Sequence, residues 1–222
     1  MNKNIIDGIE YLPHHFSFGT TTVFHSNDSE LYSFTTYVGK HNVLIEQGES
    51  AWYYYDYEGP DNARSMAAAS IRGPRDVVSD YCCTVVKGYA PQDRSAVIST
   101  TNLPYVNGCS TESLLPPIRL GDPTLQILYM PPNSSEQQHH IHSTVRVVFV
   151  LAGVGVNIYG MDEVNIREIP LNAGDVVILD KMLPHHFITS DQPLVCSPFH
   201  VFSSVGGAEQ NHPMFNGTHM TD

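Results

Sequence analysis

Basic residues are scarce in this sequence of 222 residues. Lysine and arginine together number 11, against 23 aspartates and glutamates, so the formal net charge is −12. No cluster of basic residues offsets this balance. Nucleic acids and anionic membranes both need a basic face on the proteins that bind them. We therefore expect neither a nucleic acid nor a membrane as a partner.

Long apolar runs are also missing. No segment approaches the roughly 20 apolar residues needed to cross a bilayer, and the first 15 residues lack the apolar stretch of a signal peptide. The four cysteines include no CxxC pair that would indicate a zinc knuckle. Cys82 and Cys83 are adjacent and poorly placed to pair with each other. These absences lead us to expect reduced thiols in a cytoplasmic protein.

Helical periodicity is hard to find, and short β-forming runs take its place. Hydrophobic residues make up 41% of the chain and charged residues only 15%, which is typical of a globular protein. Strands are predicted at 20–25, 31–38, 42–46, 51–57, 81–86, 96–101, 125–130, 145–151, 155–160, 175–180, 185–190 and 195–202. The alanine-rich segment 63–70 is predicted as a short helix. Many short strands separated by turn residues predict an all-β sandwich or barrel.

The segment 103–123 concentrates proline, glycine and serine and suggests a boundary. It divides the chain into a β-rich N-terminal part, residues 1–105, and a C-terminal part, residues 106–222. All recognisable chemistry lies in the second part.

Histidines crowd the start of a predicted buried strand, in the segment "EQQHHIHSTVRVVFVL" at 136–151. In a strand, His140, His142 and Arg146 would share one face, and the residues from Ile141 to Leu151 at odd positions would form an apolar opposite face. Two imidazoles at this spacing can chelate one divalent ion. A third ligand is available at His185, which follows two predicted turns and opens another strand. A one-residue slip would instead present His139 and His186.

These residues resemble the two motifs of the cupin superfamily, G(x)5HxH(x)3-4E(x)6G and G(x)5PxG(x)2H(x)3N, over roughly residues 120–203. His140, His142, Arg146 and Gly153 fall on the HxH, acidic and closing-glycine positions of the first motif, and Gly174, Asp180, Met182, His185 and Thr189 on the corresponding positions of the second. The resemblance implies a cupin double-stranded β-helix, or jelly-roll barrel. The N-terminal part would then be either a degenerate second cupin barrel or a strand-rich extension. Arginine in place of the acidic ligand, and the missing proline and middle glycine, depart from the pattern.

The resemblance implies that His140, His142 and His185 bind a divalent metal. Fe(II) is favoured, and Zn, Ni and Mn remain open; a barrel that has lost its metal is the alternative. Arg146 cannot be a ligand, and a buried guanidinium needs a carboxylate. That carboxylate would come either from Glu136, Asp175 or Asp180, or from an anionic substrate.

Cupins with three histidines and no acidic ligand resemble Fe(II) dioxygenases, so we expect a dioxygenase acting on a small carboxylate-bearing substrate. A non-oxidative lyase or isomerase and a non-catalytic binding module are the alternatives. His200 is a further candidate catalytic group and Tyr129 a candidate substrate contact. Since cupins commonly dimerise through their sheets, a homodimer is expected.

Overall fold

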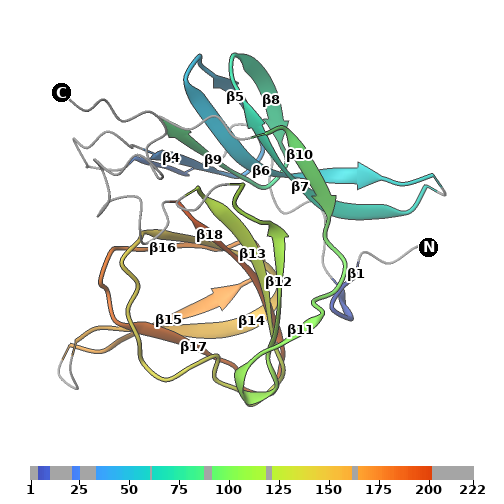
Figure 1. Cartoon of the computed structure of the whole chain (residues 1–222). Coiled ribbons are helices and arrows are strands. Elements are labelled where there is room, and N and C mark those ends of the chain that lie inside the picture. The colour runs from blue at the N-terminus through green and yellow to red at the C-terminus, as the bar shows by residue number, and fades with distance from the viewer. Residues whose placement is uncertain are drawn as a thin grey trace.

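The computed structural model shows a protein built almost wholly of β-strands (Figure 1). The residues that it describes are 5–10, 22–25, 34–60, 62–87, 92–118, 122–161 and 165–201. Within these ranges the one helical element is a 3-10 turn, η1 (Val106–Gly108), and no helix is long and apolar enough to cross a membrane. The predicted all-β class is confirmed.

The N-terminal part forms a six-stranded antiparallel sheet. In spatial order its strands are β10 (Arg94–Val97), β7 (Arg64–Arg72), β6 (Glu49–Glu58), β9 (Cys82–Lys87), β4 (Phe34–Val38) and β3 (Thr22–His25). β5 (His41–Ile45) pairs with β8 (Arg75–Ser79), and β1 (Ile5–Ile6) with β2 (Ile9–Glu10). A small apolar core joins the β5–β8 pair to the large sheet; it comprises Val43, Ile45, Ala51, Ile71, Val77, Cys83 and Val85. Whether this part is a degenerate barrel or an extension stays a prediction.

The C-terminal part is a second, eight-stranded sheet. Its strands run in the order β11 (Leu103–Pro104), β12 (Ser110–Leu115), β13 (Thr124–Met130), β18 (Leu194–His200), β14 (Arg146–Tyr159) and β15 (Arg167–Asn172), with β16 (Val176–Leu179) and β17 (His185–Ile188) also paired to β14. In Figure 1 these strands curve around a common interior, with β16 on one side and β17 on the other. The division into residues 1–105 and 106–222 stays a prediction.

β14 is the central strand of this sheet and pairs with four other strands. Its first half pairs with β18 and β16, and its second half with β15 and β17. The register against β18 shifts between Val150 and Ala152, and Gly153 follows with a positive φ of 77°. A bulge of this kind bends a strand and increases its twist. The bend lets one strand serve both sides of the curved sheet.

The two parts of the chain are joined by one apolar core. Side chains at odd positions of β14, such as Phe149, point into this core, where the Phe149 ring lies 4.9 Å from the ring of Tyr54 on β6. Trp52 stacks 5.0 Å from Phe199 in the same way. The Tyr54 hydroxyl donates a 2.7 Å hydrogen bond to Ser197 Oγ. The N-terminal sheet therefore packs on the back of β14 and β18, the strands that carry Arg146 and His200.

Three local differences separate the structure from the predicted strands. The predicted helix at 63–70 is wrong, because this segment lies in β7. Its alanines Ala67, Ala68 and Ala69 pair with the bulky tyrosines of β6, so packing overrides the helix propensity of alanine. The strands predicted at 145–151 and 155–160 are one strand, β14. The strands β12 and β15 and the two-residue strands β1, β2 and β11 were not predicted; β12 lies within the proline-rich segment 103–123.

All four cysteines are free in the structure, and all four are buried. Burial raises the pKa of Cys82 to about 12, which makes the thiol a poor nucleophile.

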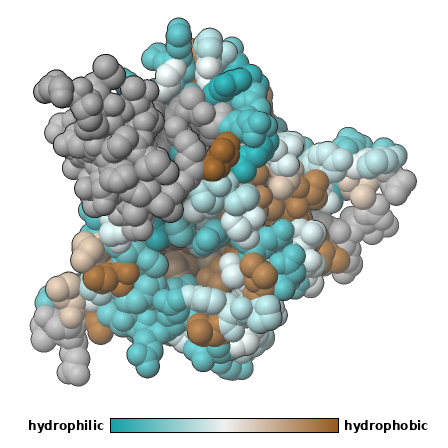
Figure 2. Space-filling view, in the orientation of Figure 1, coloured by the Kyte–Doolittle hydropathy of each residue, from teal (hydrophilic) through white to brown (hydrophobic). Residues whose placement is uncertain are grey.

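On the face seen in Figure 2, apolar residues form separate patches among polar ones. The expected homodimer stays a prediction.

Replacing Gly153 by alanine should destabilise the fold more than the same change at Gly48. Both glycines have a positive φ, 77° and 85°. A Cβ at Gly153 would lie 2.0 Å from the carbonyl oxygen of Pro193, whereas a Cβ at Gly48 meets nothing within 4 Å. G48A therefore reports the left-handed backbone alone, about 1–2 kcal/mol, and urea unfolding should show a clearly larger loss for G153A. Equal losses would mean that the close approach at Gly153 is unimportant.

Candidate metal centre

One backbone bridge brings the two histidine segments together. The His140 N–H donates to the His185 carbonyl at 3.1 Å, and the His185 N–H donates to the His140 carbonyl at 2.9 Å. The Met182 N–H also donates to the His142 carbonyl at 2.7 Å, from a turn in which Met182 has a φ of 61°. The predicted antiparallel placement of His185 opposite the HxH pair is confirmed.

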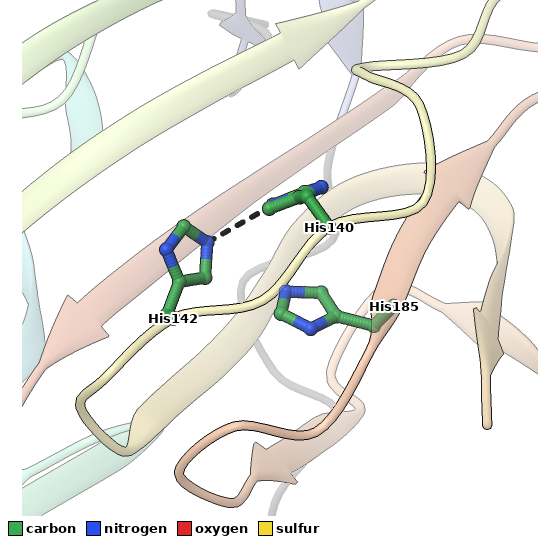
Figure 3. A group of neighbouring side chains, drawn as sticks. All are labelled: His140, His142 and His185. Atoms are coloured by element: carbon green, nitrogen blue, oxygen red, sulfur yellow. Dashed lines mark hydrogen bonds between the residues drawn. The ribbon is translucent and has the colours of Figure 1, made fainter. Parts of the chain in front are cut away.

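The three imidazoles His140, His142 and His185 converge on one point (Figure 3). One ring nitrogen from each lies within 4.8 Å of the other two, and the Nε2 atoms of His140 and His142 lie 3.0 Å apart. Nitrogen ligands lie about 2.0–2.1 Å from a zinc ion, so two ligands of one ion are separated by about 3–4 Å. The spacing of this donor set fits a single divalent ion.

The outer nitrogens of two of these rings are already engaged. His140 Nδ1–H donates to the Gln138 carbonyl at 2.9 Å, and His185 Nδ1–H donates to the Leu183 carbonyl at 2.7 Å. Metal-binding histidines commonly make this contact, which fixes the tautomer and leaves the Nε2 lone pair for the ion. The orientation of both rings thus suits coordination through Nε2.

The path between the two ligating histidines differs from the prediction. The segment was expected to be a strand from His140 onward, but β14 begins only at Arg146 and residues 141–145 lie outside any strand. Ile141, predicted to lie on a buried apolar face, is 48% exposed. Both imidazoles still lie on the same side, since backbone hydrogen bonds to His185 and Met182 hold the two ends of the HxH segment.

The triad lines a cavity of about 300 Å³ inside the C-terminal sheet. Its polar lining includes Arg146 and His200, which are direct partners on β14 and β18. The other lining residues are Tyr105, Thr111, Gln126, Leu128, Glu136, Gln137, Val148, Leu179, Phe187 and Pro198. Arg146 therefore lies on the side of the histidines, as expected, although no continuous strand joins them.

Arg146 is buried, at 9% exposure, and has no acidic partner among the described residues. Its Nη1 donates to the Thr144 carbonyl at 3.4 Å. Two of the three predicted internal partners are engaged elsewhere: Asp175 accepts from the Asn172 N–H, and Asp180 from the Lys181 N–H. The Arg–Asp bridge considered from the sequence is not formed.

Glu136 is a cavity residue that the sequence suggested only as a partner for Arg146. Its carboxylate Oε1 lies 3.6 Å from His140 Nε2, and the residue is 8% exposed. Burial raises the pKa of Glu136 to about 7. The carboxyl can therefore exist in either protonation state near neutral pH.

Burial favours the neutral form of three histidines in the cavity, His142, His185 and His200. Desolvation, with the positive charge of Arg146 as the next cause, lowers the pKa of His142 to about 3 and that of His200 to about 3. Desolvation likewise lowers the pKa of His185 to about 4. Neutral imidazole is the ligating species, so no proton competes with an ion at His142 or His185 near neutral pH.

Tyr129 does not take the predicted place at the cavity. It packs against the core between the two sheets, whereas its neighbours Gln126 and Leu128 line the cavity. Alternation along β13 explains the difference, because residues at even positions point inward. Tyr105, which follows β11, lines the cavity instead; no pattern in the sequence marked it.

His139 and His186 do not belong to the triad. They face each other on the opposite side of the His140–His185 bridge, with their Nδ1 atoms 2.9 Å apart. The one-residue slip considered from the sequence is therefore absent, and the HxH register is the one that faces the cavity.

In the metal-free protein, stability should rise as the pH rises from 4.5 to 6.5. Unfolding returns His142, His185 and His200 to the ordinary pKa of 6.5, so the unfolded chain binds more protons in this window. Glu136 opposes this, since its pKa falls from about 7 to 4.5 on unfolding, but it is one group against three. Urea unfolding with a chelator across this range tests the expectation, and His200→Gln should flatten the profile. An unchanged slope in that variant would contradict it.

The comparisons with known proteins agree with this geometry. Residues 126–202 match the family model of the cupin domain. No curated protein matches the chain. Similar solved structures include a cupin 2 conserved barrel domain protein from Leptotrichia buccalis, with 11% identity, a TM-score of 0.49, and coverage of 82% of this chain and 89% of that one.

Two further similar structures come from named enzymes. Oxalate decarboxylase from Bacillus subtilis shares 11% identity with a TM-score of 0.48, over 83% of this chain and 76% of that one. The polyketide cyclase RemF from Streptomyces resistomycificus shares 19% identity with a TM-score of 0.37, over 45% of this chain and 68% of that one. The matched segment 126–202 contains the whole histidine triad and most of the cavity wall. This segment, residues 126–202, is a cupin domain.

Proposed function

We propose that this protein is a metal-dependent cupin enzyme, an Fe(II) dioxygenase that acts on a small carboxylate-bearing substrate. The observation that carries the proposal is the meeting of three imidazoles in a single cavity with one guanidinium that has no acidic partner among the described residues. The imidazoles can bind a metal ion, and the guanidinium can bind an anion. Neither feature is needed to stabilise a barrel.

His140, His142 and His185 would hold the metal through Nε2. Three neutral ligands leave the full charge of a divalent ion in place, which favours anionic substrates. Bound there, Fe(II) would supply the activation of dioxygen. Imidazole also suits Zn, Ni and Mn, so the identity of the metal is the part of the proposal that metal analysis decides.

Arg146 would bind the substrate carboxylate. A buried guanidinium without a counter-ion is unfavourable, and a carboxylate ligand would relieve this while forming two parallel hydrogen bonds. The ring centroid of His142 lies 6.4 Å from that of His200, the strand partner of Arg146. An anion held at Arg146 would therefore lie beside the metal ligands.

His200 would contact the same substrate. It is neutral at physiological pH, so one ring nitrogen can donate a hydrogen bond and the other can accept one. Leu128, Val148, Leu179 and Phe187 form the apolar part of the wall. This wall would exclude water and suit a short apolar portion of the substrate, and the cavity volume of about 300 Å³ limits the substrate to a small molecule.

A non-oxidative lyase or isomerase is the second candidate. It is favoured by Glu136, a carboxyl at the cavity wall whose pKa of about 7 suits proton transfer near neutral pH. In that case Zn, Ni or Mn would polarise a carbonyl group of the substrate. Metal analysis followed by oxygen uptake with a panel of small acids separates the two candidates, because only the dioxygenase consumes oxygen.

Replacing His185 by alanine should abolish metal binding. The protein is purified without chelator, and its metal content is measured by elemental analysis. We expect one iron per chain in the wild type and substoichiometric iron in H185A, because two imidazoles remain. His41→Ala, a histidine of the N-terminal sheet, is the matched control and should keep the wild-type content. Full iron in H185A would remove the triad from consideration.

Replacing Arg146 by methionine should leave the metal in place and weaken the binding of acids. Hydrogen bonds to charged groups contribute about 1.5–3 kcal/mol, so the KM of an active acid should rise roughly 10- to 100-fold. The amide of that acid should bind wild type and R146M alike. If R146M still preferred the acid over the amide as strongly as the wild type does, the anion would bind elsewhere.

A further inference from the structure

A second pair of imidazoles lies outside the cavity, next to the backbone bridge that carries two residues of the triad. His139 and His186 are the residues next to the His140–His185 bridge, and neither is among the residues that line the cavity. Their Nδ1 atoms lie 2.9 Å apart, and their rings meet edge to face with planes at 84°. The pair is not part of the site described above.

The orientation of His139 is fixed by a backbone contact. Its Nε2–H donates a 2.6 Å hydrogen bond to the Gly160 carbonyl, and the Gly160 N–H donates to the Pro184 carbonyl at 3.0 Å. His139 Nδ1 is then the unprotonated nitrogen, with its lone pair directed at His186. Histidines that bind metals commonly donate the other ring N–H to a backbone carbonyl in this way.

The separation of the two Nδ1 atoms suits chelation. Two nitrogens about 2.0–2.1 Å from one ion and at right angles to each other are about 2.9 Å apart. An ion would replace the single proton that the two nitrogens now share. We propose that His139 and His186 bind a second divalent transition-metal ion through Nδ1, with water at its remaining positions. Imidazole pairs select ions such as Zn²⁺, Cu²⁺ and Ni²⁺.

The two sites use different atoms and share one backbone bridge. The inner histidines His140 and His185 have their Nδ1 atoms bonded to carbonyls and present Nε2, whereas His139 has its Nε2 bonded and presents Nδ1. No nitrogen serves both sites. An ion at the outer pair would also clamp the bridge that positions the inner ligands His140 and His185, so its binding should raise the melting temperature.

Zinc titration of the full chain tests this proposal. Metal-free protein is dialysed against Zn²⁺, and the bound equivalents are counted by elemental analysis. We expect two equivalents for the wild type and for the control H41A, and one equivalent for both the outer variant, His139→Ala with His186→Ala, and the inner variant, His140→Ala with His142→Ala. The melting temperature of the inner variant should still rise with Zn²⁺. Two equivalents retained by the outer variant would overturn the proposal.

The outcomes separate the two sites. Zinc bound by the inner variant and lost from the outer variant would support the outer site and count against the triad; the reverse would support the triad and overturn the outer site. If the double alanine variant does not fold, as judged by circular dichroism, His186→Gln replaces it. Copper spectroscopy then supplies the readout: in the inner variant, Cu²⁺ should show coupling to two imidazole nitrogens, and His186→Gln should remove one of them. Unchanged coupling would overturn the proposal.

Discussion

The two backbone hydrogen bonds between His140 and His185 are the constraint on which the site depends. They join a segment without regular structure to the first residue of β17. His140 and His185 line the cavity, whereas their neighbours His139 and His186 do not. A cavity-facing triad and an outward-facing pair follow from the same bridge. Hydrogen bonds between main-chain atoms set the spacing. Imidazoles from two segments that are distant in sequence therefore converge.

The wall behind the triad is shared with the rest of the fold. β14 presents Arg146 and Val148 to the cavity, while Val147 and Phe149 enter the core against the N-terminal sheet. The Tyr54 hydroxyl continues this contact to Ser197, whose own hydroxyl donates to the Gln126 carbonyl at 2.7 Å. The N-terminal sheet thereby braces the strands that carry the cavity residues. This arrangement gives the N-terminal part a structural role in positioning the site.

Charge inside the cavity is arranged by desolvation. Burial lowers the pKa of His142, His185 and Arg146, the last to about 10, and raises that of Glu136 to about 7. The result is a set of imidazole nitrogens beside one cationic side chain that lacks an acidic partner among the described residues. A cavity of this kind is poorly satisfied by protein groups alone, and an anionic ligand next to a cation would complete it.

Much of the fold and of the site was readable from local patterns. The all-β class follows from short runs of β-branched and aromatic residues, and the turn at Gly174 together with the HxH spacing was enough to pair His185 with His140. These signals are local or depend on period-two alternation, which survives in any strand. The resemblance of the same residues to the cupin motifs agreed with the family match.

Other features were decided by packing between distant segments. The alanines of β7 lie in a strand, rather than in the predicted helix, because they pair with the large tyrosines of β6. Tyr129 does not line the cavity, because the pairing of β13 with β18 decides which alternate residues of β13 face inward. Tyr105, in the loop after β11, lines it instead. The sequence by itself determined which residue types meet at the His140–His185 bridge. Only the tertiary structure decided that none of the described carboxylates pairs with Arg146, because pairing of charges depends on distances between strands that no local pattern encodes.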